Sequence, residues 1–391
     1  MPFSLDVNLG LDVWWARELP LPGPRVGLVT HQAAVGVGCR SAVETFAAAK
    51  DVELVALFGP EHGLTGEAQD LIPVREPDRA PAGPRVHSLY GETFESLKPT
   101  PQMLRGLDAL VIDLQDVGSR YYTFQATMLY CMEAAAAVGL PVVVLDRPNP
   151  IGFLPIEGPT VRPGFESFVG VHPIPTVHTL TVGELAGLYK AERVPGLDLT
   201  VVKCENYRPN NPWTWVLPPS PNMPTVDTAL VYPGMCLIEG TNLSEGRGTT
   251  RPFEYVGFPG VDPRPLAEWL NREKLPGVNF VPVHFRPTFQ KHAGKTCGGV
   301  FLAVSDPTEF RPVRTGLAVI AAFRVVLGEQ FRWRTERYEF VDDKPAIDLL
   351  FGSDRERLAL EAGVPWREIA AAWEPEEAAF RDRREPHLLY S

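Results

Sequence analysis

Short apolar runs alternate with longer mixed stretches through roughly the first half of the chain. The apolar runs are typical of buried strands and lie at RVGLVT (25–30), ELVALF (53–58), DALVIDL (108–114), PVVVL (141–145) and 197–204. The stretches between them predict helices at 41–49, 101–107, 122–138 and 181–190. Thr181 and Glu184 form a capping box, and Gly139 stands where a helix ends. Because strands alternating with helices favour a parallel sheet, we expect a Rossmann-like, doubly wound α/β domain.

The pattern changes after residue 254. We predict helices at 264–273, 315–328, 353–363 and 365–383, and strands near 279–286 and 299–304. Ser353 and Glu356 form another predicted capping box. A chain of 391 residues exceeds the size at which one core stops growing. We therefore expect a catalytic domain over 1–232 and a smaller α+β domain over 233–391 that contributes to the cleft.

Residues 218–254, between these two parts, show neither the helical nor the strand period. They are rich in proline and glycine, which favours irregular turns. Apolar residues such as Met223 and Phe253 argue against disorder. The segment is therefore predicted to be ordered and irregular and to close one wall of a site. The alternative is an inter-domain strap without chemistry.

The composition excludes several classes of protein. A net charge of −11 without a long basic run argues against binding to nucleic acid or to an anionic membrane surface. No apolar run is long enough to span a membrane. Five scattered cysteines without a C-x-x-C pair fit reduced thiols better than disulfides or a zinc site. The first residues lack the basic and apolar regions of a secretory signal, so we expect a cytoplasmic protein.

Polar residues follow four of the predicted strands directly. They are Thr30-His31-Gln32, Glu61-His62, Gln115-Asp116 and Asp146-Arg147-Asn149. Ligands of open α/β sheets bind outside the carboxyl ends of the strands. The four clusters therefore predict one cleft lined by Gln32, Glu61, Asp116 and Asn149, whereas the alternative is ordinary loop solvation.

Several familiar chemistries have no motif in this chain. It contains no G-x-S-x-G elbow, no phosphate-binding G-x-x-x-x-G-K-[ST] loop and no H-E-x-x-H pair. Gly36 to Ser41 nearly match a dinucleotide fingerprint, but the third glycine is a serine. The potential metal ligands His62, Asp113, Asp116 and Asp146 lack standard spacing, and we interpret Cys297 as a structural thiol. No metal and no cofactor is expected.

Carboxylate chemistry remains. The apolar strand and Pro60 before Glu61 predict a desolvated carboxyl group with a raised pKa, which suits a general acid. Asp116 could supply a second carboxylate, with Glu92 and Glu239 as competitors. The chain also contains arginines that could bind an anionic group, namely Arg120, Arg147, Arg247 and Arg251. Tyr121, Tyr122, Trp213 and Trp215 could stack on a sugar, and Asn149, Asn222, Asn242 and His178 could form hydrogen bonds with hydroxyl groups. Together they suggest hydrolysis of an acidic glycan.

Several longer motifs resemble one family from about residue 25 to the C-terminus. They are FGPEHG (58–63), SLYGE (88–92), DLQDVGSRYYT (113–123), LDRPNPIG (145–152), PSPNMPT (219–225) and EGTNLSEGRGTTRPFE (239–254). This set is similar to the NamZ family of exo-β-N-acetylmuramidases, the YbbC-like proteins formerly described as a domain of unknown function. The resemblance implies a Rossmann-like domain, a smaller C-terminal domain and an active site in the cleft.

The same resemblance implies an activity. It is the release of N-acetylmuramic acid from non-reducing ends of peptidoglycan fragments during cell-wall turnover and recycling, with peptidoglycan-derived saccharides as partners. The glutamate of the PEHG motif falls on Glu61, and the substrate's lactyl carboxylate would explain nearby arginines in an acidic protein. Two-carboxylate hydrolysis requires no cofactor.

From both lines of reasoning we predict a set of site residues. The catalytic candidates are Glu61, Asp116, His62 and Glu239. The substrate-binding candidates are Gln32, Arg120, Tyr121, Asn149, His178, Asn222, Asn242 and Arg247. Two other functions stay open: a non-catalytic glycan-binding protein and a metal-dependent hydrolase of another bond.

Overall fold

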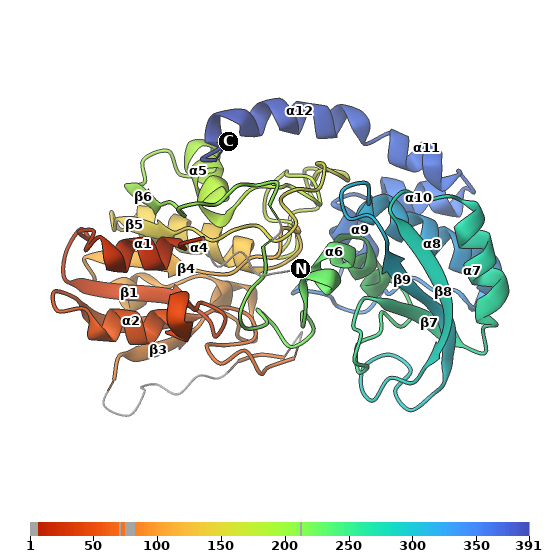
Figure 1. Cartoon of the computed structure of the whole chain (residues 1–391), viewed down its shortest axis with the longest axis horizontal. Helices are drawn as coiled ribbons and strands as arrows, with labels where there is room; N and C mark the ends of the chain where they lie inside the picture. The colour runs from red at the N-terminus through yellow and green to blue at the C-terminus, as the bar shows by residue number, and fades with distance from the viewer. Residues whose placement is uncertain (1–6, 70–71, 75–82, 212, 391) are drawn as a thin grey trace.

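The computed structural model describes residues 7–69, 72–74, 83–211 and 213–390. In this part of the chain, the N-terminal half forms a six-stranded sheet with the order β3-β2-β1-β4-β5-β6 (Figure 1). Its strands are β1 (Arg25–Thr30), β2 (Glu53–Gly59), β3 (Arg85–Ser88), β4 (Ala109–Asp113), β5 (Val142–Leu145) and β6 (Leu199–Val202). All neighbouring strands run parallel. The predicted Rossmann-like, doubly wound sheet is therefore confirmed, and its order reverses between β1 and β4.

Helices cover both faces of this sheet (Figure 1). They are α1 (Gly10–Ala16), α2 (Ala42–Ala48), α3 (Pro101–Leu104), α4 (Phe124–Ala137) and α5 (Val182–Arg193). In β4, Val111 packs in the apolar cluster of α1 and α2, whereas Leu110 and Ile112 pack in the cluster of α4 and α5. Because neighbouring residues of a strand point to opposite faces, a strand buried on both sides is apolar throughout.

The predicted helix ends are confirmed in this domain. The side chain of Thr181 accepts a hydrogen bond from the backbone N–H of Glu184, and the Glu184 side chain accepts one from the N–H of Thr181. Gly139 follows α4 with a φ of +68°, a conformation that glycine adopts without strain. These two signals fix where α5 begins and where α4 ends.

The second domain packs helices against a smaller sheet. Within the described residues this is a three-stranded antiparallel sheet of β7 (Tyr255–Pro259), β9 (Cys297–Val304) and β8 (Val278–Phe285). The helices are α6 (Val226–Met235), α7 (Pro263–Arg272), α8 (Pro312–Leu327), α9 (Ala346–Phe351), α10 (Arg355–Glu361) and α11 (Trp366–Ala371). Helices α6 and α8 approach closely at Gly234 and Gly316. A Cβ atom on Gly316 would lie 2.2 Å from the carbonyl oxygen of Gly234, so only glycine fits there.

The prediction that residues 218–254 are irregular throughout is wrong. The segment contains α6 and a 3₁₀ helix, Cys236–Gly240. Every residue from Thr228 to Met235 is buried, so α6 has no polar face and shows no helical period in the sequence. Pro233 and Gly234 also gave a misleading signal, because tertiary packing outweighs their low helix propensity.

Two other details of the sequence prediction are wrong. The helix expected over 365–383 is divided into α11 and α12 (Glu374–Arg384). Pro375 is the reason, because proline is compatible with the first turn of a helix but not with its interior. The capping box at Ser353 does not form: α10 begins after Asp354, and the Ser353 hydroxyl donates to the Glu356 side chain at 2.5 Å.

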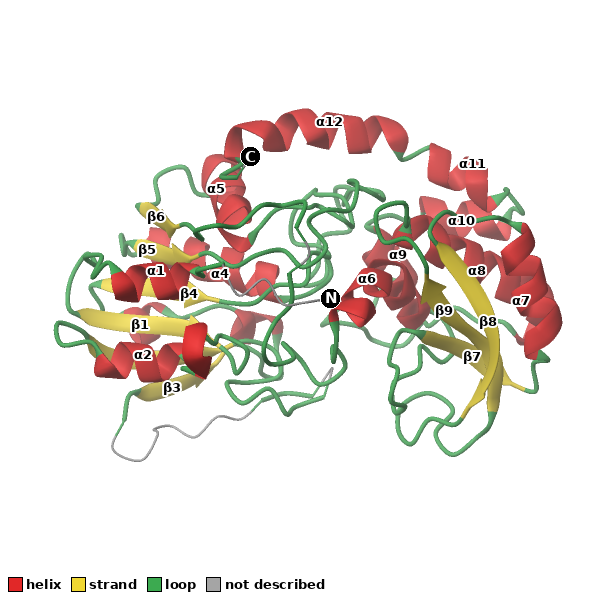
Figure 2. Ribbon diagram, viewed as in Figure 1, coloured by secondary structure: helices red, strands yellow, loops and turns green. Residues whose placement is uncertain are grey.

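Helix α12 and the residues after it connect the two domains (Figure 2). The Glu377 carboxylate accepts hydrogen bonds from the N–H of Gly158 (3.0 Å) and from Arg314 (3.1 Å). Further along, Arg383 forms a hydrogen bond of 2.6 Å with Glu192 of α5. Tyr390 donates its hydroxyl proton to Asp146 at 2.5 Å. The C-terminal segment therefore returns to the N-terminal domain.

Candidate active site

The predicted polar strand ends lie together at the carboxyl edge of the large sheet. The N–H of Gln115, after β4, donates to Nε2 of His31, after β1, at 2.9 Å. The Gln115 side chain donates to the carbonyl of Pro148, after β5, at 3.2 Å. Gln32 donates to the carbonyl of Pro218 at 3.1 Å. The loops after three strands are thus joined to each other and to the segment 218–254 at the point where the strand order reverses.

A cavity, which we call the catalytic cavity, opens between the two domains. The N-terminal domain supplies polar and aromatic side chains to its wall, including Glu61, His62, Tyr121, Tyr122 and Thr123. Ser220, Asn222, Met223 and Tyr232 continue this lining, and the second domain builds the opposite wall with Glu239, Arg247, Phe253, Tyr338 and Glu339. The free volume of the cavity is about 40 Å³, which is room for a few water molecules.

Glu61 reaches the cavity from a tight turn at the end of β2. The N–H of Gly63 donates to the carbonyl of Pro60 at 3.0 Å, and His62 between them has a φ of +72°. A positive φ is uncommon for histidine and occurs more often at functional sites. Glu61 is 5% exposed, and its Oε2 accepts a hydrogen bond of 2.6 Å from the hydroxyl of Thr123 at the start of α4. The turn and the helix together hold this carboxyl group in place.

His62 has a defined tautomer. Its Nδ1 lies 2.7 Å from the carbonyl oxygen of Ala68. A carbonyl only accepts hydrogen bonds, so Nδ1 carries the proton, and Nε2 of the neutral ring is an acceptor. His62 therefore offers a base or a hydrogen-bond acceptor to the cavity that it lines.

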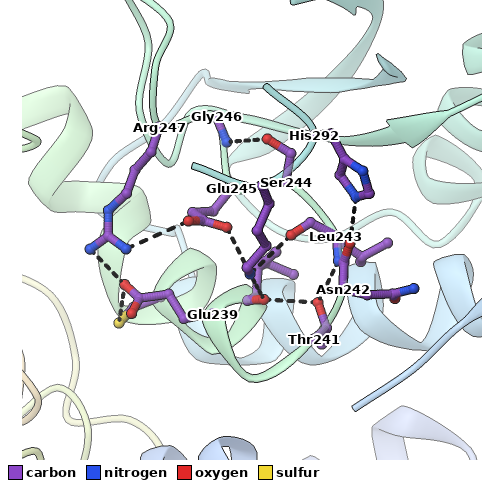
Figure 3. Close-up of polar contacts among 12 residues, drawn as sticks. Glu239, Thr241, Asn242, Leu243, Ser244, Glu245, Gly246, Arg247 and His292 are labelled. Atoms are coloured by element: carbon purple, nitrogen blue, oxygen red, sulfur yellow. Dashed lines mark hydrogen bonds and ion pairs between the residues drawn. The ribbon is translucent and has the colours of Figure 1, made fainter. Parts of the chain in front are cut away.

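Glu239 and Arg247 form an ion pair on the opposite wall (Figure 3). The guanidinium lies 2.9 Å from one oxygen of Glu239, and Tyr338 donates its hydroxyl proton to the other oxygen at 3.0 Å. Arg247 also lies 3.5 Å from Glu245, which is paired with Lys291 at 2.9 Å. These charge-assisted contacts fix the direction of the guanidinium.

Glu245 keeps its charge although it is fully buried. Burial alone would raise the pKa of this carboxyl group, but the charges of Lys291 and Arg247 outweigh burial and lower the pKa. The Lys291 ammonium also donates to the carbonyls of Ile238 and Leu243, each at 3.0 Å. This arrangement makes the loop 239–247 a rigid support for Arg247.

Asp116 lies behind the cavity wall rather than in it. Its Oδ2 accepts a hydrogen bond of 2.6 Å from the N–H of Gly118 and lies 3.8 Å from Nε2 of His178. Burial raises the pKa of Asp116 to about 7 and lowers the pKa of His178 to about 3, so the imidazole is neutral. Burial, and to a lesser extent the charges of Asp116 and Glu61, raises the pKa of Tyr122.

The structure brings about half of the predicted site residues to the catalytic cavity. Those that line it are Glu61, His62, Tyr121, Asn222, Glu239 and Arg247. Those that lie outside its lining are Gln32, Asp116, Arg120, Asn149, His178 and Asn242.

The residues outside the lining bind the protein's own backbone. Arg120 has no exposed surface and donates to the carbonyls of Ile174 (2.9 Å), Leu350 (2.6 Å) and Pro159. Asn149 donates to the carbonyl of Leu180. Asn242 bonds to the backbone of Gln330 and Arg332. These hydrogen bonds hold the loops around the site in place.

Sequence reasoning missed Tyr338 and Glu339, which line the cavity. They lie near the C-terminal end of the chain, far in sequence from the other site residues and outside the motifs considered above. No periodicity or spacing connects them to Glu61. Tertiary folding alone places Tyr338 and Glu339 beside the other residues of the catalytic cavity.

Three further observations concern the remainder of the described chain. Among the described residues, no group of three or more His, Cys, Asp or Glu side chains could hold a metal ion. None of the helices in the same residues combines the length and apolar composition that a membrane crossing requires. The five cysteines are all unpaired. Burial raises the pKa of Cys297 to about 11, in keeping with a structural thiol.

Comparison with known proteins gives one consistent result. A family model for the N-terminal domain of the exo-β-N-acetylmuramidase NamZ matches residues 26–227, and the model for its C-terminal domain matches residues 230–390. The peptidoglycan β-N-acetylmuramidase NamZ of Bacillus subtilis (strain 168) is 44% identical over 375 residues, which cover 95% of this chain and 88% of that protein.

Two crystal structures of DUF1343 family proteins from Bacteroides fragilis NCTC 9343 share the fold. The first superposes with a TM-score of 0.88 and 31% identity, covering 99% of this chain and 100% of the other. The second has a TM-score of 0.77 and 30% identity, covering 99% of both chains.

Proposed function

This chain belongs to the NamZ family of exo-β-N-acetylmuramidases, and we propose that its catalytic cavity releases N-acetylmuramic acid from the non-reducing ends of peptidoglycan fragments. The enzyme is a glycosidase that acts on peptidoglycan. The assignment of this chemistry to individual residues rests on the geometry of the cavity.

One observation carries the assignment. Glu61 and Glu239 line the same cavity from opposite domains and have different surroundings. The neighbour of Glu61 is the neutral hydroxyl of Thr123, whereas Glu239 is paired with a guanidinium. Glycosidases use two carboxyl groups that flank the bond to be cleaved and act in different roles.

Glu61 is the proposed general acid. It gives its proton to the glycosidic oxygen while the bond from that oxygen to C1 of the muramic acid breaks, so the leaving sugar departs as a neutral alcohol. Glu239 is the proposed second carboxylate, which as an anion stabilises the positive charge that develops at C1. Its place in the cavity lining supports Glu239 over Asp116, which lies behind the wall. Nε2 of His62 accepts a hydrogen bond from the bound sugar or from the attacking water.

Arg247 is the proposed partner of the lactyl carboxylate. Among the described residues that line the catalytic cavity, Arg247 is the one arginine. Its ion pairs with Glu239 and Glu245 fix the direction of the guanidinium. A charge-assisted hydrogen bond to a carboxylate contributes roughly 1.5–3 kcal/mol when well formed. N-acetylglucosamine lacks this carboxylate, so the contact favours muramic acid.

The decisive experiment measures hydrolysis of a 4-nitrophenyl β-N-acetylmuramide by the wild-type protein, with and without a chelator. We expect release of nitrophenol in both cases. A protein that binds the sugar without hydrolysing it would instead match the alternative of a glycan-binding protein. Loss of activity with chelator would favour the metal-dependent hydrolase.

We further propose that the substrates are fragments recycled in the cytoplasm. The five unpaired cysteines support a reducing compartment. Fractionation of the cells that make this protein, followed by immunodetection, tests the location. Recovery mainly outside the cytoplasm would contradict it.

A further inference from the structure

A second cavity, which we call the outer cavity, shares a wall with the catalytic cavity. Its volume is about 210 Å³. The residues that matter for its chemistry are Tyr90, Glu92, Arg337, Glu339 and Phe340. Glu339 also lines the catalytic cavity, so its side chain belongs to the partition between the two spaces.

The partition is a tight turn with an unusual sequence. Tyr338 and Val341 exchange two backbone hydrogen bonds of 2.9 Å, so Glu339 and Phe340 are the two central residues of a hairpin turn. Their φ angles are +45° and +69°. Such turns require positive φ at both positions and favour Asn-Gly, which adopts it easily. A Glu-Phe pair is strained there, and strain of this kind is retained where the side chains are needed.

Both side chains of the turn are held in place. Glu339 is 6% exposed, and its Oε2 accepts a hydrogen bond of 3.2 Å from the hydroxyl of Tyr90. The ring of Phe340 packs edge-to-face against Tyr90 at 5.6 Å and against Phe168 at 6.4 Å. The strained backbone therefore carries one ordered carboxylate and one ordered ring into the space between the cavities.

The outer cavity combines groups that suit a neutral sugar. Glu92 and Glu339 offer carboxylate acceptors for hydroxyl groups. The Arg337 guanidinium offers donors and stacks 5.8 Å from the centre of the Phe340 ring. Tyr90 and Phe340 add aromatic surface. These donors, acceptors and rings match the hydroxyl groups, the amide group and the apolar face of a neutral sugar.

We propose that the outer cavity binds the first sugar of the leaving group, an uncharged N-acetylhexosamine, and that Glu339 accepts a hydrogen bond from this sugar beside the bond that is cleaved. This inference rests on the proposed function. An enzyme that removes a terminal sugar holds that sugar in one pocket and needs a neighbouring space for the remainder of the glycan. The outer cavity lies on the far side of Glu339 and supplies that space.

The test compares two substrates that differ only in the leaving group. One is the disaccharide of N-acetylmuramic acid and N-acetylglucosamine, and the other is the 4-nitrophenyl glycoside, which has no leaving sugar. For Glu339→Gln and for Arg337→Ala we expect kcat/KM on the disaccharide to fall about 10- to 100-fold. For Arg337→Ala, which lies outside the lining of the catalytic cavity, the loss on the nitrophenyl glycoside should be less than about threefold. Glu336→Gln is the matched control, because Glu336 is exposed and lies outside the lining of both cavities.

The two variants protect the test against a folding defect. Glu339 is buried, but Arg337 is exposed, so Arg337→Ala removes from the turn only the stacking on the Phe340 ring. Equal losses on both substrates would place these residues in binding of the terminal sugar and overturn the proposal. Unchanged activity of both variants on the disaccharide would also overturn it.

A binding measurement separates this inference from the proposed function. Titration of the wild type and Arg337→Ala with N-acetylglucosamine, followed by saturation-transfer NMR, reports on the outer cavity without catalysis. We expect binding to the wild type that weakens at least about tenfold in the variant. A wild type that hydrolyses neither substrate yet shows this difference refutes the proposed function alone. Absence of binding to the wild type refutes the sugar site.

Discussion

Replacement of Glu61 by glutamine tests the central assignment, because glutamine keeps the shape of the side chain but has no acidic proton. The amide oxygen can still accept the hydrogen bond that Thr123 now donates to Glu61 at 2.6 Å. A hydrogen bond between neutral groups contributes about 1 kcal/mol, so even its complete loss would change the melting temperature by only a few degrees. The variant should therefore fold and bind substrate nearly as the wild type does.

The loss of activity should depend on the leaving group. A general acid contributes roughly 10²- to 10⁴-fold, which corresponds to about 2.7–5.4 kcal/mol of transition-state stabilisation. We expect this loss in kcat on the disaccharide, whose alcohol leaving group requires a proton. The loss on the 4-nitrophenyl glycoside should be much smaller, since nitrophenolate leaves without protonation.

The assay measures kcat and KM on both substrates, together with the melting temperature, for the wild type, Glu61→Gln, Glu239→Gln and Glu336→Gln as a surface control. Glu239→Gln should slow both substrates, because stabilisation of charge at C1 does not depend on the leaving group. An equal loss on both substrates in Glu61→Gln would refute its role as an acid and make it the nucleophile or base. No loss on either substrate would place the reaction elsewhere.

Three further predictions concern other parts of the site. Arg247→Ala should reduce the preference for 4-nitrophenyl N-acetylmuramide over the N-acetylglucosaminide by roughly 10- to 100-fold in kcat/KM, and an unchanged ratio would refute the lactyl contact. Arg120→Met leaves three buried carbonyls without donors and should cost about 3–5 kcal/mol of unfolding free energy, seen in urea denaturation, without changing that ratio. Asp116 has a pKa raised from 3.8 to about 7, so the folded state binds the extra proton and wild-type stability should decline as pH rises from about 4 to 7. In Asp116→Asn this contribution is absent, and equal slopes of melting temperature against pH for both proteins would contradict the shift.

The sequence predicted the parallel sheet and its polar edge because both follow from local rules. A strand buried on both faces must be apolar, and the residues after it must turn and meet solvent or ligand, so Glu61 stood out at the end of β2. Helix α6 was hidden by the same physics, because a helix buried on every side has no period.

The direction of individual side chains within the site could not be predicted in the same way. Arg120 and Arg247 both lie in motifs with carboxylates nearby in sequence, yet one faces three carbonyls and the other faces the cavity. Side-chain direction depends on tertiary contacts, which spacing does not reveal. Glu339 was missed because its position depends on a turn with two positive φ angles. Glutamate and phenylalanine rarely occupy such a turn, so the sequence did not predict it.

The hydrogen bond from Tyr390 to Asp146 links the folding of the two domains. Asp146 also accepts, through its backbone carbonyl, a hydrogen bond of 2.9 Å from the N–H of Gly10, so residues near both ends of the chain meet at the end of β5. The C-terminal residues therefore pack against the N-terminal domain after the chain has passed through the second domain. Cutting the chain between the two family segments would remove Tyr390 and α12 from the Rossmann-like part, and neither product would be a complete folding unit. The two domains should therefore unfold in one cooperative transition, and two separate transitions in calorimetry would contradict this coupling.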